Sequence, residues 1–255
     1  MSVVTTQLDG HVLQIRIDHP AKKNALTMEM YDVMSAALER AEADTAVRAV
    51  VFSGAAGNFC SGNDVSGFPA AGSGTQGPNP VMRFVEALVN ASVPIVAAVE
   101  GVAAGIGATM LLHLDAVVAS AGTKIVFPFL NLALVPEAGS SLLLVRLLGY
   151  TRAAELVLRA GSVDGSEAHR LGIVSRLAET GAVGQVALGI AGEFAAKPPQ
   201  AMRRAKRLMK SDTAELLQRI REEERGVFLG LNSAEGAEAL QAFREKRRPD
   251  FSRTN

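Results

Sequence analysis

The sequence predicts an α/β fold followed by a helical C-terminal region. Short apolar runs typical of strands alternate with segments of helical periodicity up to about Gly149, and this alternation indicates an α/β domain. After Gly149 the expected elements are helical, and charged residues become dense from Thr213 onward. The chain has 255 residues, of which 48% are hydrophobic, so it can bury one large core.

The first half of the sequence predicts strands that alternate with helices. Val12 to Asp18 alternates apolar and polar residues, as a half-buried strand does. Thr27 is the expected N-cap of an amphipathic helix that ends near Asp44. The valine-rich run from Val47 to Ser53 predicts a strand buried on both faces. Further along we expect a helix over 81–90, a strand over 95–99, a helix of small residues from about Gly105 and a strand over 115–120.

The second half predicts helices over 153–160, 166–171 and 199–210. The charged segments 221–225 and 244–248 are expected as solvated helical faces rather than parts of a second core. Between the early elements, residues 67–80 are dense in Gly, Ala, Ser and Pro and predict a mobile surface loop that flanks a site.

Charge and composition exclude several classes of function. The 26 basic residues balance the 26 acidic ones, so the basic excess of a nucleic-acid or polybasic membrane binder is absent. No segment approaches the roughly 20 apolar residues of a membrane span, and the N-terminus lacks a secretory pattern, so we expect a cytoplasmic protein. A single cysteine, Cys60, forms no internal disulfide. Four scattered histidines give no support to a zinc site, and no metal is expected.

Several short motifs resemble known functional motifs, but the residues around them do not support those functions. The segment Gly72–Gly77 matches a dinucleotide-binding pattern, but no strand precedes it and no helix opens at its last glycine. Ser140 and Ser141 do not stand in a Gly-x-Ser-x-Gly elbow, which disfavours serine hydrolysis. Cys60 has no neighbouring cation in sequence, so we expect a packed thiol rather than a nucleophile.

Two glycine-rich stretches, 59–65 and 100–107, each follow a predicted buried strand. Flexible backbone at a strand exit can direct free N–H groups into a crevice, and two such donors would form an oxyanion hole. The same glycines are equally suited to tight turns and close helix packing. From the residues alone, both interpretations remain open.

Seven motifs in fixed order, spread over nearly the whole chain, resemble those of the crotonase, or enoyl-CoA hydratase/isomerase, superfamily. They are Asn24-Ala-Leu, Ser61-Gly-Asn-Asp, Pro94-Ile-Val-Ala-Ala-Val-Glu-Gly, Asp115-Ala-Val-Val-Ala-Ser, Pro136-Glu-Ala-Gly-Ser-Ser, Ala168-His-Arg-Leu-Gly-Ile-Val and Phe243-Arg-Glu-Lys-Arg-Arg. The resemblance implies a ββα spiral core, assigned to residues 1–195, and a helical oligomerisation region over 196–255. It also implies a homotrimer that can pair into a hexamer, with an acyl-CoA thioester as substrate.

The resemblance further implies roles for individual residues. The thioester carbonyl would lie between the backbone N–H groups of Asn63 and Ile106, next to Gly62 and Gly105. The two glutamates with which similar hydratases activate water are replaced here by Thr109 and Phe129, which disfavours hydration. One carboxylate remains, Glu137, in a Pro-Glu-x-x-Ser-Ser motif similar to that of monofunctional peroxisomal-type Δ3,Δ2-enoyl-CoA isomerases. Such an isomerase moves a proton from C2 to C4 through an enolate with a single base.

The remaining expectations concern substrate contacts and rival functions. By resemblance, Lys22 or Lys23 and Lys246 or Arg247 would bind the CoA phosphates, while Ser61 and Phe129 would border the substrate. Asp64 is expected to anchor its own turn, and no cofactor is needed beyond the CoA of the substrate. The alternatives are a crotonase-type hydratase, a thioester hydrolase, or a CoA-binding or assembly protein without turnover.

Overall fold

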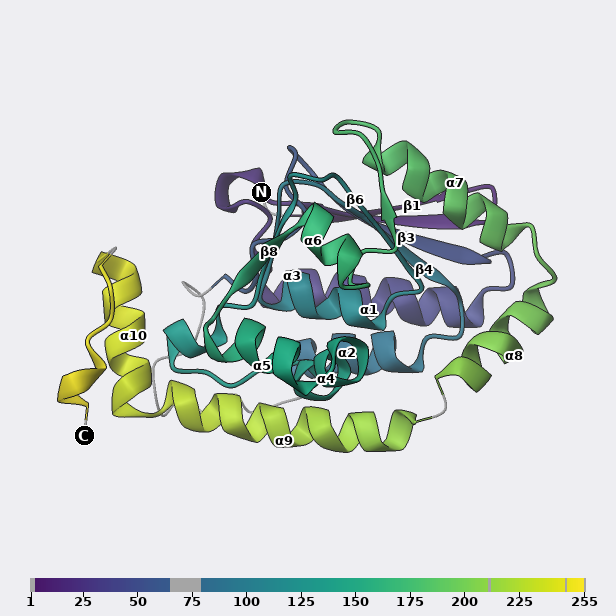
Figure 1. The fold of residues 1–255 in the computed structure, drawn as a ribbon. Coiled ribbons are helices and arrows are strands. Elements are labelled where there is room, and N and C mark those ends of the chain that lie inside the picture. Colours follow the sequence, from purple (N-terminus) through teal and green to yellow (C-terminus); the bar gives the residue numbers. More distant parts are fainter. Residues whose placement is uncertain (1–2, 65–78, 211, 246, 255) are drawn as a thin grey trace.

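The computed structural model describes residues 3–64, 79–210, 212–245 and 247–254, and strands and helices alternate through them (Figure 1). The larger sheet has the strand order β1-β2-β3-β4-β6-β9. Its β1–β2 pair is antiparallel, and every further pairing in it is parallel. Its strands are β1 (Val3–Asp9), β2 (Val12–Asp18), β3 (Ala49–Gly54), β4 (Ile95–Val99), β6 (Ala116–Ala119) and β9 (Arg176–Leu177).

A smaller sheet has the order β5-β7-β8 and is built from three-residue strands. In it, β5 (Val102–Ala104) pairs parallel with β7 (Lys124–Val126), which pairs antiparallel with β8 (Ser162–Asp164). Because β5 follows β4 after a two-residue turn, the chain passes directly from the larger sheet to the smaller one.

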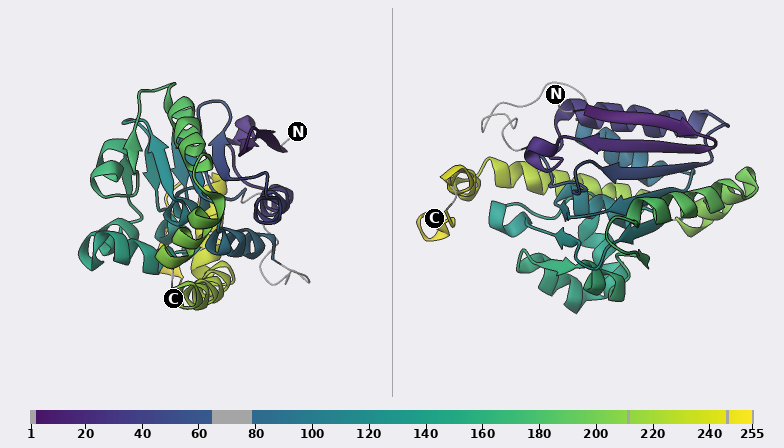
Figure 2. Two further views of the ribbon diagram at one scale, coloured as in Figure 1. Left: turned by 90° about the vertical axis from the view of Figure 1, so that its right-hand side faces the viewer. Right: turned by 90° about the horizontal axis from the view of Figure 1, so that it is seen from above.

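Helices cover both faces of the larger sheet. Helix α1 (Met28–Ala43) packs beside α2 (Pro80–Asn90) on one face, and α7 (Val183–Ala195) covers the other (Figures 1 and 2). Each face has its own apolar core: residues of α1 and α2 belong to one cluster and those of α7 to the other. Strand β4 is therefore buried on both faces, as its sequence predicts.

The remaining helices link or surround these layers. The shorter ones are the 3-10 helices η1 (Pro20–Lys22), η3 (Met110–His113) and η4 (Phe129–Leu132), together with α3 (Ile106–Thr109), α4 (Ser140–Leu148), α5 (Tyr150–Leu158) and α6 (Gly165–Arg170). The C-terminal region consists of α8 (Pro199–Met209), α9 (Thr213–Leu231), α10 (Ala234–Glu245) and the 3-10 helix η5 (Phe251–Arg253). Helix α9 runs along α2 and α4, and α10 lies at the end of the molecule where the chain terminates (Figure 1).

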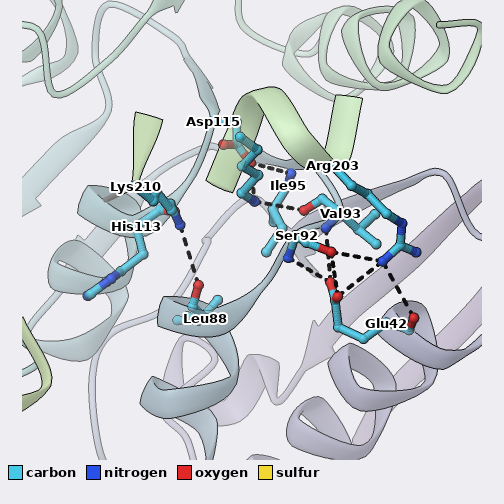
Figure 3. Close-up of polar contacts among 10 residues, drawn as sticks. Glu42, Leu88, Ser92, Val93, Ile95, His113, Asp115, Arg203 and Lys210 are labelled. Carbon is cyan, nitrogen blue, oxygen red and sulfur yellow. Dashed lines mark hydrogen bonds and ion pairs between the residues drawn. The ribbon is translucent and has the colours of Figure 1, made fainter. Parts of the chain in front are cut away.

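Polar contacts fasten α8 to the rest of the molecule (Figure 3). Lys206 Nζ donates to Asp115 Oδ2 at 2.6 Å and to the Val93 carbonyl at 2.7 Å. Arg203 Nη1 lies 3.0 Å from Glu42 Oε2, and Lys210 Nζ donates to the His113 carbonyl at 2.7 Å. Because α9 follows α8, these contacts also set where α9 begins.

The structure confirms the predicted strands over 12–18 and 95–99. The helices predicted from Thr27 to about Asp44, over 81–90 and over 199–210 are observed as α1, α2 and α8, with bounds that differ by one residue at most. Two differences matter. Helix α7 was not predicted, because its sequence is apolar on most sides and carries Gly184, Gly189 and Gly192. The interpretation of 221–225 as a solvated face is wrong at Glu223, which is only 5% exposed. The predicted loop 67–80 and the rejected motif 72–77 lie outside the described residues, apart from Asn79 and Pro80.

Candidate active site

The two glycine-rich stretches lie side by side. Cys60 and Ala103 form a parallel bridge, in which Cys60 N donates to Val102 O at 3.0 Å and Ala104 N donates to Cys60 O at 2.9 Å. A Cβ atom on Gly62, whose φ is +103°, would lie 3.2 Å from Ala104 O. Gly62 therefore permits both the positive φ and the close approach of the two loops.

The N–H groups of Asn63 and Ile106 are left available by this arrangement. Leu26 N donates to Gly62 O and Asp64 N donates to Leu26 O, both at 2.8 Å, so the bridge uses the residues on either side of Asn63. Ile106 is the first residue of α3, where helix geometry offers its N–H no partner. Among the described residues, neither N–H has a hydrogen-bond acceptor.

Glu137 reaches the same place from the loop before α4. A Cβ atom on Gly105 would lie 3.8 Å from Glu137 Oε1 and 3.8 Å from Gly62 Cα. The structure thus brings together the carboxylate and the two glycine loops that sequence analysis assigned to one site. Glu137 is not a helical residue, since α4 begins at Ser140. A role in starting that helix is therefore a poor explanation of its position.

The carboxyl group of Glu137 has an unusual environment. Its burial, together with the negative charge of Glu223, raises its pKa to about 7. Ser140 N donates to the Glu137 carbonyl at 3.0 Å, and His113 Nε2–H donates to the Ala138 carbonyl at 2.7 Å. A carboxyl group with this pKa can both accept and return a proton near neutral pH.

Tyr31 and Glu223 complete the surroundings of the site, and neither is among the site residues predicted from the sequence. The Tyr31 hydroxyl donates to Asn63 Oδ1 at 2.5 Å. Burial raises the pKa of Tyr31 well above its usual value, and electrostatic repulsion from the nearby ionisable groups of Glu137 and Cys60 adds to this effect. Tyr31 occupies a core position of an amphipathic helix, and Glu223 stands in a run of charged residues. Neither pattern distinguishes them from ordinary helical residues.

Other predicted residues lie at or near these loops. Phe129 and Thr109 are buried, and the Thr109 hydroxyl has no partner among the described residues. Ser61 Oγ donates to the Lys22 carbonyl at 2.8 Å, so Ser61 fixes the turn that carries this lysine. The prediction of Cys60 as a packed thiol is confirmed: it is fully buried, and burial raises its pKa to about 12.

The cations predicted to bind CoA come from two segments that are far apart in the sequence, one near residue 22 and one near residue 247. Lys22 Nζ lies 2.6 Å from Asp64 Oδ2, and Asp64 N donates to the Leu26 carbonyl, so these bonds of Asp64 join its loop to the segment 22–26. Lys246 lies outside the described residues, and Arg247 makes a two-pronged ion pair with Glu238 of α10.

Neither a metal site nor a membrane-spanning helix is found among the described residues. Within them, no three His, Cys, Asp or Glu side chains gather in a way that would hold a metal ion. None of the helices in the same part of the chain combines the length and the apolar character needed to cross a membrane.

Comparison with known proteins gives matches over almost the whole chain. Residues 7–254 match the family model described as enoyl-CoA hydratase/isomerase. The chain is 33% identical to enoyl-CoA delta isomerase 2 of Rattus norvegicus over 221 residues, which cover 85% of this chain and 56% of the rat protein. It is 30% identical to the mitochondrial methylglutaconyl-CoA hydratase of Mus musculus over 248 residues, covering 94% of this chain and 79% of that protein.

A crystal structure of an enoyl-CoA hydratase/isomerase from Pseudoalteromonas atlantica T6c has the same fold. Its TM-score is 0.92 at 36% sequence identity, and the match covers 98% of this chain and 99% of that one. The solved structure thus shares the architecture of this chain, while the names of the sequence relatives include an isomerase and a hydratase.

Proposed function

The chain belongs to the enoyl-CoA hydratase/isomerase family, and we propose that within this family it shifts the double bond of a 3-enoyl-CoA to give trans-2-enoyl-CoA. Its α/β core and helical C-terminal region form the crotonase fold predicted from the sequence. It is therefore a crotonase-type acyl-CoA enzyme, and the proposal concerns which reaction it catalyses.

One observation carries the proposal: Glu137 is the carboxylate that meets the two glycine loops. Its Oε1 approaches Gly105, next to the N–H groups proposed as oxyanion donors. The positions at which similar hydratases carry glutamates hold Thr109 and Phe129, both buried and neither able to act as a carboxylate base. A water molecule would thus lack the pair of carboxylates that activates it, whereas moving a double bond consumes no water.

The proposed reaction uses one base twice. Glu137 takes a proton from C2 of the substrate, and the electron pair moves toward the thioester oxygen to form an enolate. The N–H groups of Asn63 and Ile106 donate to that oxygen and stabilise its negative charge. The protonated Glu137 then returns a proton at C4 while the double bond forms between C2 and C3. Atoms and charge balance, and the mechanism uses no cofactor beyond the CoA of the substrate.

We also propose that the CoA phosphates are bound by Lys22 or Lys23 and by Lys246 or Arg247. Ser61 would support the Lys22 turn through its hydrogen bond to the Lys22 carbonyl. Phe129 would form part of the apolar wall around the acyl chain. The division into a catalytic core over 1–195 and an oligomerisation region over 196–255 belongs to the same proposal.

The test is incubation with trans-3-enoyl-CoA, followed by the ultraviolet absorbance of the conjugated 2-enoyl product. Wild type should turn over, and Glu137→Gln should lose about two to four orders of magnitude in kcat because the base is removed. The exposed Glu193 of α7 supplies the matched control, since Glu193→Gln should keep wild-type activity.

The pH profile gives a second measurement of the same assignment. Because the base must be deprotonated in the free enzyme, kcat/KM should rise with pH through about 7. Wild-type turnover that survives Glu137→Gln would rule out Glu137 as the base. Hydration of trans-2-enoyl-CoA, or acyl-CoA binding without any turnover, would replace the isomerase proposal with one of its rivals.

A further inference from the structure

Glu223 is a buried carboxylate on a helix whose other charged residues are largely exposed. On α9, the residues that are buried are Ile220 and Glu223. Removing a carboxylate from water is costly unless strong hydrogen bonds compensate, so its position requires an explanation. Burial indeed raises the pKa of Glu223, while its hydrogen bonds and the nearby Arg219 lower it.

Both oxygens of Glu223 accept hydrogen bonds from the backbone beside Glu137. Gly139 N donates to Oε2 at 2.5 Å, and Ser141 N donates to Oε1 at 2.9 Å. These N–H groups belong to the N-cap and the second residue of α4, where a helix leaves its donors unpaired. A carboxylate in this position satisfies two of them and opposes the positive end of the helix dipole.

The local sequence explains why this cap comes from another helix. The N-cap of α4 is Gly139, which has no side chain to accept from the helix and has a φ of +76°. A Cβ atom there would lie 2.5 Å from Leu216 Cδ1 and 3.3 Å from Ile220 Cγ1. A Ser, Thr or Asp cap would be strained at this left-handed φ, and Glu223 of α9 supplies the acceptor instead.

The turn held by Glu223 carries Glu137. The Glu137 carbonyl accepts from Ser140 N, and Ser140 lies between the two residues that donate to Glu223. On the other side, His113 holds the Ala138 carbonyl. With the backbone fixed at both points, the Glu137 side chain has a defined origin opposite Gly105.

We propose that Glu223 is a positioning residue for the double-bond shift, in which it orients and electrostatically tunes Glu137 from the C-terminal region of the chain. The inference rests on the proposed function, because the proposed function assigns Glu137 as the base. Glu223 touches neither substrate nor reacting atoms; it acts through the Gly139–Ser141 turn and through its charge. Tyr31 and Cys60 also lie near Glu137, but both are neutral at physiological pH, whereas Glu223 can contribute a negative charge.

The test compares Glu223→Gln with Glu222→Gln, which removes the same charge from an exposed position on the same helix. A glutamine side chain at this position offers one acceptor oxygen instead of two and no charge. We expect kcat to fall roughly tenfold through misplacement of the base, with KM little changed. The acidic limb of kcat/KM should move to lower pH by roughly one unit, because a neighbouring negative charge is removed. Glu222→Gln should retain the wild-type limb and kcat.

The position of the limb does not depend on how much of the variant is folded, so a merely structural role would leave it unchanged. An unmoved limb together with wild-type kcat would overturn the inference. If Glu223→Gln does not fold, Glu223→Asp is measured instead. It keeps the charge but is too short for both N–H groups, and it should lose turnover while the limb stays near that of wild type. Wild-type kcat in Glu223→Asp would equally overturn the inference.

A direct titration separates this inference from the proposed function. In the full-length protein labelled with carbon-13 at glutamate Cδ, the NMR resonance missing from Glu137→Gln reports the pKa of Glu137. It should titrate near 7 in wild type and at lower pH in Glu223→Gln. This shift in a protein without isomerase activity would refute only the proposed reaction. Isomerase activity with the same pKa in both proteins would refute the role of Glu223.

Discussion

Tyr31 links the first long helix to the loop that carries a proposed oxyanion donor. Its hydroxyl donates to Asn63 Oδ1, and its ring packs against Phe84 with 5.6 Å between centroids. The ring is held by apolar packing, so the hydroxyl is presented to Asn63 in a fixed direction. The hydrogen bond restrains the Asn63 side chain and, through it, the peptide that carries the proposed oxyanion donor.

Replacing Tyr31 by Phe should therefore reduce turnover without disturbing the core. Tyr31→Phe keeps the ring and removes one buried hydrogen bond, which is worth about 0.5–1.5 kcal/mol, so kcat should fall by up to about tenfold. The measurement is steady-state isomerisation of trans-3-enoyl-CoA. Tyr150, which is exposed, provides the control, and Tyr150→Phe should behave as wild type. Equal kcat values for the two variants would show that the hydrogen bond from Tyr31 to Asn63 does not contribute to turnover.

At the scale of single elements, α8 depends on charged groups that are withdrawn from water. The side chain of Lys206 is 3% exposed, and it donates to both Asp115 and the Val93 carbonyl. Asp115 Oδ2 also accepts from Ile95 N at 2.7 Å, at the start of β4. One carboxylate thus joins α8 to the start of β4 in the larger sheet.

Removing one partner of this buried pair should destabilise the protein. Lys206→Met leaves the Asp115 carboxylate without its cation, so we expect a loss of roughly 3 kcal/mol in the free energy of unfolding. Urea titration followed by circular dichroism measures it. Arg207→Met, at the next and exposed position of α8, should change stability by less than about 0.5 kcal/mol. A similar free energy of unfolding for the two variants would mean that Lys206 does not anchor α8.

Elements differ in how far their sequences define them. β4 and the first four residues of β3 are apolar and buried, so their pattern alone predicts these strands. Strands β5, β7 and β8 have three residues each, too few to show any periodicity. They exist because neighbouring segments supply the hydrogen-bond partners, and that information is not local.

At the scale of the whole molecule, the C-terminal helices leave large apolar side chains uncovered. Leu208 and Met209 at the end of α8 are 80% and 79% exposed, and Phe228 and Leu229 of α9 are 59% and 69% exposed. Apolar surface of this kind usually marks a protein interface. It supports the proposal that residues 196–255 mediate assembly of the homotrimer or hexamer.

Polar substitutions on α9 should accordingly weaken assembly. Wild type is expected to be a trimer or a pair of trimers by light scattering, and the double variant Phe228→Ser, Leu229→Ser should shift toward smaller species at micromolar concentration. Val33→Ser, on an exposed position of α1, serves as the control and should keep the wild-type mass. A monomeric wild type, or a double variant of unchanged mass, would contradict the assignment of this surface.

The sequence by itself determined the class of fold, the strands buried on both faces and, through the family motifs, Glu137 and the two glycine loops. These features are encoded locally, in apolar runs and in short motifs of fixed spacing. Only the tertiary structure decided that Glu223 is a buried cap beside Glu137 and that Tyr31 holds Asn63. The hydrogen bonds of Glu223 join residues 84 and 82 positions apart in the chain. A glutamate within a charged helix has the same local pattern whether it faces water or a neighbouring helix, and its burial is fixed only when α9 packs against α4.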